Sequence, residues 1–191
     1  MSEGKKKWTV SFNAPVVLIF SLIALAALIL GYCTGGLTTG LLFSVYRSSL
    51  LDPLTYVRMI GHVFGHANVG HLVGNLMIIL LLGPFGEKRY GSGRSVIVIL
   101  VTAIVTGLVH FIFVPNTALL GASGVAFAFI ILSSLAEFKR HEIPVTFLLV
   151  AALYLGQQIV GLFLQDSVSQ LTHILGGVVG GFFGFIWKEK K

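Results

Sequence analysis

Ser123 and His173 are the residues of this chain whose types and surroundings suggest covalent chemistry. Ser123 lies in Gly121-Ala122-Ser123-Gly124, at the start of an apolar segment, and His173 lies near the start of another such segment fifty residues later. A serine hydroxyl becomes a nucleophile when a neighbouring base takes its proton, and the histidine imidazole is suited to that role. Because polar side chains are costly within apolar segments, the pair raises the hypothesis of peptide hydrolysis inside a membrane.

Two further polar residues are spaced to assist such a reaction. Asn75 follows His71 by four residues, so both side chains lie on one face of a helix, one turn apart. With the backbone N–H of Ser123 they could donate hydrogen bonds to a tetrahedral oxyanion, a contact worth about 3 to 4 kcal/mol per donor. No carboxylate is placed to complete a triad, because Asp166 precedes His173 by about 10 Å along a helix. The sequence therefore predicts a Ser123–His173 dyad with His71 and Asn75 as oxyanion donors.

The composition is that of a membrane protein. Of the 191 residues, 55% are hydrophobic and 10% are charged, whereas a soluble domain has about 25% charged residues. The mean hydropathy is +0.94. We therefore expect an all-α, polytopic membrane protein in which residues 1–191 form a single domain.

Six apolar stretches are each near the roughly 20 residues that a helix needs to cross a bilayer. They run over about residues 15–33, 67–85, 95–113, 119–136, 143–164 and 168–187. An even number of spans places both termini on one side of the membrane.

The distribution of basic residues predicts which side that is. Only Arg47 and Arg58 fall in the loop after the first span, and none fall in the third or fifth loop. The remaining basic residues lie in the termini and in the second and fourth loops: Lys5, Lys6, Lys7, Lys88, Arg89, Arg94, Lys139, Arg140, Lys188, Lys190 and Lys191. By the positive-inside rule the termini are cytoplasmic. The second, fourth and sixth spans then run from the outside to the inside.

This orientation brings the polar residues to one depth. His71, Ser123 and His173 each lie four or five residues into their spans, roughly 6 to 8 Å below the outer end at about 1.5 Å per residue. Glycines follow both candidate catalytic residues: Gly124, and then Gly176, Gly177, Gly180 and Gly181. Helix surfaces without side chains let backbones approach closely, so we expect the fourth and sixth spans to touch.

Other classes of function fit less well. The net charge of +6 and the pI near 9.7 do not indicate a nucleic-acid partner, because the basic residues lie in short loops and termini. The six histidines include no HExxH pattern, so we expect no metal. Cys33 is the only cysteine, which excludes an intrachain disulfide. The proposed hydrolysis requires no cofactor.

Taken together, these residues resemble the rhomboid intramembrane serine proteases of the prokaryotic, six-helix type. The likeness begins at Arg58 and rests on four segments in the family's order and near its spacing: His66-x4-His71-x3-Asn75, Gly86-Glu87-Lys88-Arg89-x-Gly91-Ser92-Gly93, Gly121-Ala122-Ser123-Gly124 and His173-x2-Gly176-x3-Gly180. The resemblance implies Ser123 as nucleophile, His173 as base, and His71 and Asn75 as oxyanion stabilisers. It also implies that transmembrane substrates are cut near the outer face of the cytoplasmic membrane.

The sequence departs from the family's pattern at two positions. Val57 precedes Arg58 where the family often has tryptophan, which leaves the anchoring of the first loop open. Phe127, four residues after Ser123, stands where bacterial members often have a tyrosine stacked on the base. The ring is kept and the hydroxyl is lost.

The long first loop, about Thr34 to His66, is too apolar for a solvated connector. We expect it to lie partly in the outer leaflet and to pack against the helices. By resemblance, the fifth span could be a lateral gate for substrates.

Several polar residues have structural interpretations. We expect His62, His66, His110 and His141 to be structural or exposed, with His66 bonding the first loop to itself. Glu87 and the glycines after it are expected to shape a tight cytoplasmic turn.

Two rival hypotheses belong to other classes. A catalytically silent rhomboid-like protein would bind transmembrane helices without cutting them, but such relatives lose the serine or the histidine. A small transporter would show internal repeats or broken helices, and none is evident. The sequence leaves open the oligomeric state, the physiological substrate and its cleavage site.

Overall fold

The computed structural model describes residues 11–114, 116–136, 145, 148, 149, 152, 153, 156 and 167–187. The named helices are α1 (Pro15–Cys33), α2 (Leu37–Leu42), α3 (Pro53–Gly61), the 3-10 helix η1 (His62–Phe64), α4 (Val69–Tyr90), α5 (Ser92–Phe113), α6 (Ser123–Leu135) and α8 (Ser167–Ile186). Within these ranges the only β pairing is one isolated antiparallel bridge between Val45 and Leu119. The predicted all-α class is confirmed. Most of the expected fifth span, together with His141 and Asp166, lies outside the described residues.

Three of the described helices are long and apolar enough to cross a membrane: α1, α4 and α5. Helix α1 covers the same residues, 15–33, as the first expected span. Helix α4 contains Pro84 and continues five residues beyond the expected end at 85, and α5 begins at Ser92 instead of 95. Helix α6 (Ser123–Leu135) and the part of α8 from Gln170 to Ile186 are shorter apolar helices.

Helix α6 begins later than the expected residue 119, and two features of the preceding segment explain the difference. Leu119 exchanges two backbone hydrogen bonds of 2.9 Å with Val45, which holds this segment in an extended form. Gly121 then has φ +132°, a conformation that side-chain-bearing residues rarely adopt. The apolar residues 119–122 therefore belong to the loop, and the helix spans only 13 residues.

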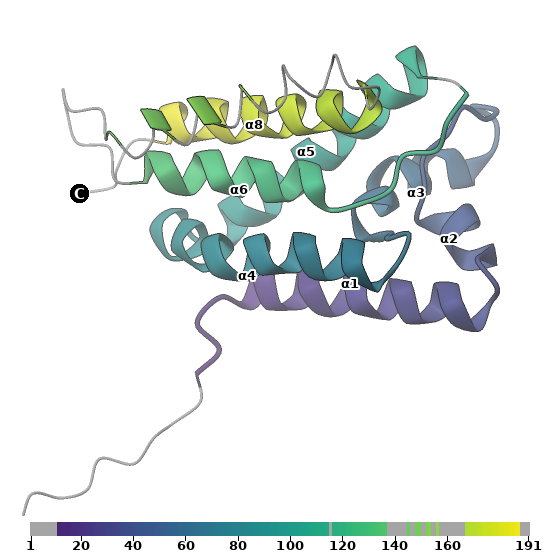
Figure 1. The fold of residues 1–191 in the computed structure, drawn as a ribbon, viewed down its shortest axis with the longest axis horizontal. Helices are drawn as coiled ribbons and strands as arrows, with labels where there is room; N and C mark the ends of the chain where they lie inside the picture. The colour runs from purple at the N-terminus through teal and green to yellow at the C-terminus, as the bar shows by residue number, and fades with distance from the viewer. Residues whose placement is uncertain are drawn as a thin grey trace, which may run out of the picture.

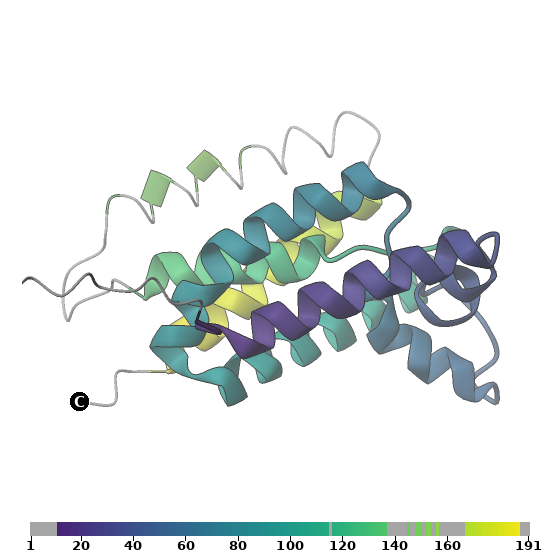
Figure 2. The same ribbon diagram turned by 90° about the horizontal axis from the view of Figure 1, so that it is seen from below.

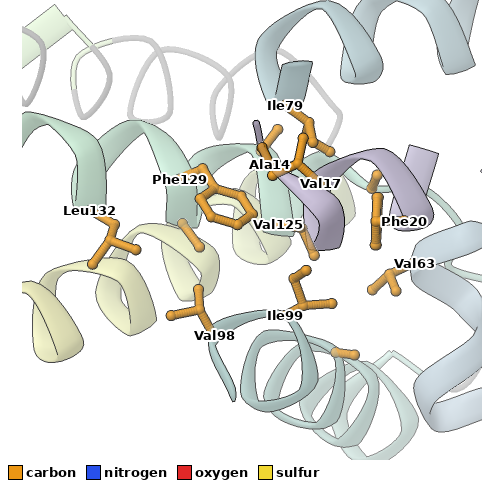
Figure 3. Close-up of a cluster of buried hydrophobic side chains, with 14 residues drawn as sticks. Ala14, Val17, Phe20, Val63, Ile79, Val98, Ile99, Val125, Phe129 and Leu132 are labelled. Carbon is orange, nitrogen blue, oxygen red and sulfur yellow. The ribbon is translucent and has the colours of Figure 1, made fainter. Parts of the chain in front are cut away.

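Helix α6 occupies the centre of the bundle, where it contacts α4, α5 and α8 (Figure 1). Helices α4, α6 and α8 all begin at the end of the bundle where α2 and α3 lie (Figures 1 and 2). Buried side chains of α6 such as Val125 and Phe129 join a core with residues of α1, α4 and α5 (Figure 3). This core fixes the position of the start of α6 relative to its neighbours.

Glu87 ties the other end of the bundle together. Its carboxylate accepts hydrogen bonds from the backbone N–H groups of Val16 (3.0 Å) and Val17 (3.1 Å) in the first turn of α1, and from the hydroxyl of Ser92 (2.7 Å). The tight turn itself is made by Gly91, at φ +93°. Beyond the predicted role in the turn, Glu87 also caps the first turn of α1, whose residue Val16 lies 71 residues earlier.

The first loop packs against the bundle, as expected from its apolar composition. Helix α2 contacts α1, and α3 contacts α5. Several large apolar side chains of the first loop remain exposed, including Leu50, Leu51 (94% exposed) and Val57. A position in the outer leaflet stays a prediction, and these side chains are suited to it.

Candidate active site

Ser123 is the first residue of α6, not a residue one turn inside it as expected. The segment before it is held by backbone bonds: the N–H of Gly121 donates to the carbonyl of His62 over 2.9 Å. The Ser123 side chain is half-buried, while Ala122 and Gly124 on either side are buried. The candidate nucleophile therefore stands at a sharp loop-to-helix junction whose backbone is fixed.

His173 is the seventh residue of α8, slightly further along its helix than expected. Its ring lies against the ring of Phe127 on α6, with the two centroids 4.4 Å apart and a tilt of 41°. An aromatic ring at this distance limits the orientations that an imidazole can adopt. Phe127 therefore lies against the candidate base, as the resemblance implies for the residue at this position.

Glycines bring α6 and α8 together. A Cβ atom on Gly176 would collide with the carbonyl of Gly124, and one on Gly180 would collide with the carbonyl of Ala128. The backbones are thus in direct contact along two turns, as the sequence predicted for these two glycines. Gly181 differs, since a Cβ there would meet only the side chain of Ile131 at an ordinary 3.7 Å. Gly176 and Gly180 are the residues that allow the close approach.

His71 and Asn75 lie beside the loop that precedes Ser123. A Cβ on Gly121 would lie 2.9 Å from Cε1 and Nε2 of His71 and 3.8 Å from Nδ2 of Asn75. Asn68 caps α4 by accepting a hydrogen bond from the N–H of His71 (2.9 Å), which fixes the first turn of this helix. The structure therefore brings both expected oxyanion donors to the segment that carries the candidate nucleophile.

His66 takes part in this arrangement in a way that the sequence did not predict. Its Nδ1 lies 3.2 Å from the carbonyl oxygen of Phe64, which is the expected bond of the loop to itself. Its Nε2 lies 3.1 Å from Nδ2 of Asn75 and 3.4 Å from the backbone nitrogen of Ala122. Burial, and secondarily the neighbouring His71, lower the pKa of His66 to about 4. No spacing pattern predicts the contact with Ala122, which lies 56 residues later in the chain.

His62 and His110 are buried and structural, as expected. The ring of His62 is bonded to the carbonyl of Met59 and to the hydroxyl of Thr106, each over 3.1 Å. Burial lowers the pKa of His62 to about 4. His110 contacts the carbonyl of Thr117 through Nε2 over 2.9 Å. Both rings connect α5 to loops near the candidate site.

Arg58 anchors the first loop without the tryptophan that often precedes it in the family. The guanidinium is 2% exposed and donates to Asp52 (2.7 Å), Ser48 (3.0 Å) and Thr55 (3.1 Å). It also lies 4.7 Å from the centre of the Tyr46 ring. The bond from Arg58 lowers the pKa of the Asp52 carboxyl, which caps α3. Val57 is exposed and takes no part in this anchor.

The residues of the site can supply a nucleophile, a base and hydrogen-bond donors. Among the described residues, no three histidine, cysteine or acidic side chains gather closely enough to hold a metal ion. A serine with a histidine base and oxyanion donors is suited to acyl transfer.

Known proteins that are similar to this chain are rhomboid proteins. A family model described as the Rhomboid domain matches residues 53–190. The chain is 28% identical to Rhomboid protease GluP of Bacillus subtilis (strain 168) over 190 residues, which cover 95% of this chain and 34% of that protein. It is 33% identical to Rhomboid-related protein 1 of Caenorhabditis elegans over 140 residues, 68% of this chain and 39% of that protein.

Rhomboid protease GlpG of Yersinia pestis (strain Pestoides F) is also similar. It is 27% identical over 184 residues, which cover 93% of this chain and 64% of that protein. The chain thus spans less than two thirds of the length of each of these three relatives.

Proposed function

We propose that this chain, which belongs to the rhomboid family, is an intramembrane serine endopeptidase. It is an integral membrane protein, with three described helices long and apolar enough to cross a bilayer. Two of the similar proteins are named rhomboid proteases, and we extend that activity to this chain. The proposed substrates are membrane proteins with transmembrane helices.

One observation carries the proposal: residues suited to acyl transfer come from three helices that begin at the same end of the bundle. His71 belongs to α4, Ser123 to α6 and His173 to α8. Backbone contact between α6 and α8 limits how far apart the serine and the histidine can lie. Such convergence is what a dyad with an oxyanion site requires.

In the proposed mechanism the Ser123 hydroxyl attacks the carbonyl carbon of the scissile peptide bond as His173 accepts its proton. The oxyanion that forms is stabilised by N–H groups of His71 and Asn75 and by the backbone N–H of Ser123. His173 then gives the proton to the leaving amine, and the C–N bond breaks. Water attacks the acyl-enzyme with His173 again as base, which releases the acid and restores the serine.

The substrate must expose its scissile bond, because a regular helix keeps its carbonyl groups in internal hydrogen bonds. We therefore propose helices that unwind locally, with a small residue at the cleavage point as the family resemblance implies. From the basic residues we propose cytoplasmic termini and a site near the outer face of a prokaryotic cytoplasmic membrane. The exposed apolar residues of the first loop are consistent with this placement.

Cleavage of a model transmembrane substrate by the purified protein in detergent tests the proposal. Wild type is compared with Ser123→Ala, His173→Ala and the control Ser134→Ala. Ser134 is another serine of α6, and its hydroxyl donates to the carbonyl of Ile130 in its own helix over 2.7 Å. We expect cleavage by wild type and the control, and losses of at least about 1000-fold in the other two.

Cleavage that survives in Ser123→Ala or His173→Ala would refute the dyad. Binding of several substrates by the wild type without any cleavage would favour the silent helix-binding protein instead.

A further inference from the structure

We propose that His66 is a positioning residue for the oxyanion site, and this proposal rests on the proposed proteolytic function. A single ring atom, Nε2, faces two groups that belong to different elements: the amide of Asn75 on α4, and the backbone of Ala122 just before the candidate nucleophile. His66 itself precedes α4 and is 3% exposed. One imidazole therefore links a proposed oxyanion donor to the backbone of the nucleophile loop.

The contacts of the ring determine its tautomer. The carbonyl oxygen of Phe64 can only accept, so Nδ1, 3.2 Å away, must carry a proton. The backbone N–H of Ala122 can only donate, so Nε2 must be an acceptor. His66 is accordingly a neutral imidazole protonated at Nδ1. The low pKa of about 4 that burial imposes is consistent with this form.

This tautomer in turn fixes the orientation of the Asn75 amide. Since Nε2 of His66 accepts, the group of Asn75 that faces it over 3.1 Å must be the NH₂ and not the carbonyl oxygen. An amide nitrogen has two N–H bonds, so one is used by His66 and the other can serve the oxyanion. Gly121 has no Cβ, and a Cβ there would lie 3.8 Å from this Nδ2 atom. The glycine therefore leaves space open beside the Asn75 amide. A rotated amide would present its oxygen and repel an oxyanion.

The ring also supports the second proposed donor. The centroids of His66 and His71 are 5.0 Å apart, with the rings at 70° to each other in an edge-to-face arrangement. His66 thus contacts both segments that would contribute to the oxyanion site: α4, through His71 and Asn75, and the backbone just before Ser123. It would itself touch neither substrate nor reacting atoms, and its effect would be exerted through Asn75, His71 and Ala122.

Steady-state cleavage by His66→Phe, His66→Gln and the control His110→Gln tests this role. Phenylalanine keeps the ring and loses the acceptor, whereas the glutamine oxygen can replace Nε2. His110 is an equally buried histidine whose Nε2 contacts the carbonyl of Thr117 and no candidate site residue. We expect kcat to fall about 10- to 100-fold in His66→Phe with KM little changed, and to recover at least partly in His66→Gln. His110→Gln should keep the wild-type kcat.

Affinity for a peptide aldehyde provides a readout that a merely structural role would not change. The aldehyde forms a tetrahedral adduct with an oxyanion, so its Kd should rise in His66→Phe by a factor similar to the fall in kcat/KM. An unchanged kcat in His66→Phe, or a fall accompanied by unchanged aldehyde affinity, would overturn the proposal while leaving the protease intact. Absence of cleavage by the wild type would instead refute the proposed function, and this proposal with it.

Discussion

Helices α6 and α8 meet backbone against backbone, whereas the first loop is joined to α4 and to the segment before α6 by hydrogen bonds that include buried side chains. In the first region, which we call the glycine contact, Gly176 and Gly180 face the carbonyls of Gly124 and Ala128. In the second, the histidine network, the buried rings of His62 and His66 and the side chain of Asn75 connect separate segments. The glycine contact therefore joins α6 to α8, and the histidine network joins the segment before α6 to the first loop and α4.

The difference shows two ways of fixing a polar site among apolar helices. The glycine contact depends on the absence of atoms, so an added methyl group should disrupt it. The histidine network depends on the presence of particular donors and acceptors, so a lost partner should disrupt it by leaving buried polar groups unsatisfied.

The largest effect is expected for Gly176→Ala in the glycine contact. Its new methyl group would collide with the carbonyl of Gly124, so α8 must shift away from α6. We expect a loss of about 1 to 3 kcal/mol in the free energy of unfolding and about 100-fold in cleavage rate, because a displacement of about 1 Å can cost that much. Thermal unfolding and cleavage in detergent measure both.

Gly181→Ala, five residues further along α8, is the matched control. Its nearest neighbour would be Ile131 at 3.7 Å, so both quantities should stay close to the wild-type values. Equal losses of stability and cleavage rate in Gly176→Ala and Gly181→Ala would show that the close backbone approach of α6 and α8 does not cause these losses.

A smaller loss is expected for Gly121→Ala, beside His71 and Asn75. An alanine would be strained at φ +132°, and its methyl group would stand 2.9 Å from the His71 ring. We expect cleavage to fall about tenfold or more, since one misplaced donor is enough to weaken the oxyanion site. The control is Gly74→Ala, at a helical position where an added Cβ would have no neighbouring atom within 4 Å. Wild-type kinetics in Gly121→Ala would contradict the proposed location of the oxyanion.

Arg58→Leu tests whether lost partners destabilise the first loop. The hydroxyls of Ser48 and Thr55 would lose a charged donor, and we expect a decrease of about 1 to 3 kcal/mol in the free energy of unfolding. Arg47→Leu should cost less, because that guanidinium is exposed and contacts the carbonyls of Phe111 and Ile112. Denaturant titration in detergent ranks the two variants, and the reverse order would count against Arg58 as the anchor.

Acid should also weaken the histidine network, over a range of pH. The pKa values of His62 and His66 are about 4 in the folded protein and about 6.5 when unfolded, so the unfolded chain binds more protons between these values. The stabilisation from keeping both rings neutral is complete above about pH 6.5 and is lost as pH falls toward 4. Unfolding measured at several pH values should show this slope, and His62→Gln should reduce it. An unchanged slope in that variant would exclude His62 as a contributor.

The sequence predicted the parts of the fold that depend on apolar run length. Residues 15–33 are free of charges and bounded by polar segments, and α1 covers that range. The start of α6 was misplaced because residues 119–122 are as apolar as the helix that follows. Their conformation depends on the bridge from Leu119 to Val45, which lies more than seventy residues earlier.

In the candidate site, too, features set by the local sequence were predicted and features set by distant contacts were not. Gly176 and Gly180 were among the glycines predicted to bring the fourth and sixth spans together, because a helix surface without side chains can be recognised from the local sequence. The roles of His66 and Glu87 were not predicted, because each depends on backbone groups of a distant segment that a spacing pattern does not contain. The local sequence thus predicts which helix surfaces lack side chains, whereas tertiary packing determines which polar groups form hydrogen bonds.

Active-site labelling of Ser123 by a fluorophosphonate, located by mass spectrometry of the intact protein in detergent, is the most direct test of the central claim. A serine attacks this probe only when a base removes its proton. We predict one label at Ser123 in the wild type and in Ser134→Ala, and loss of labelling in His173→Ala. A label on another serine, or equal labelling of Ser123 in His173→Ala, would contradict the Ser123–His173 dyad.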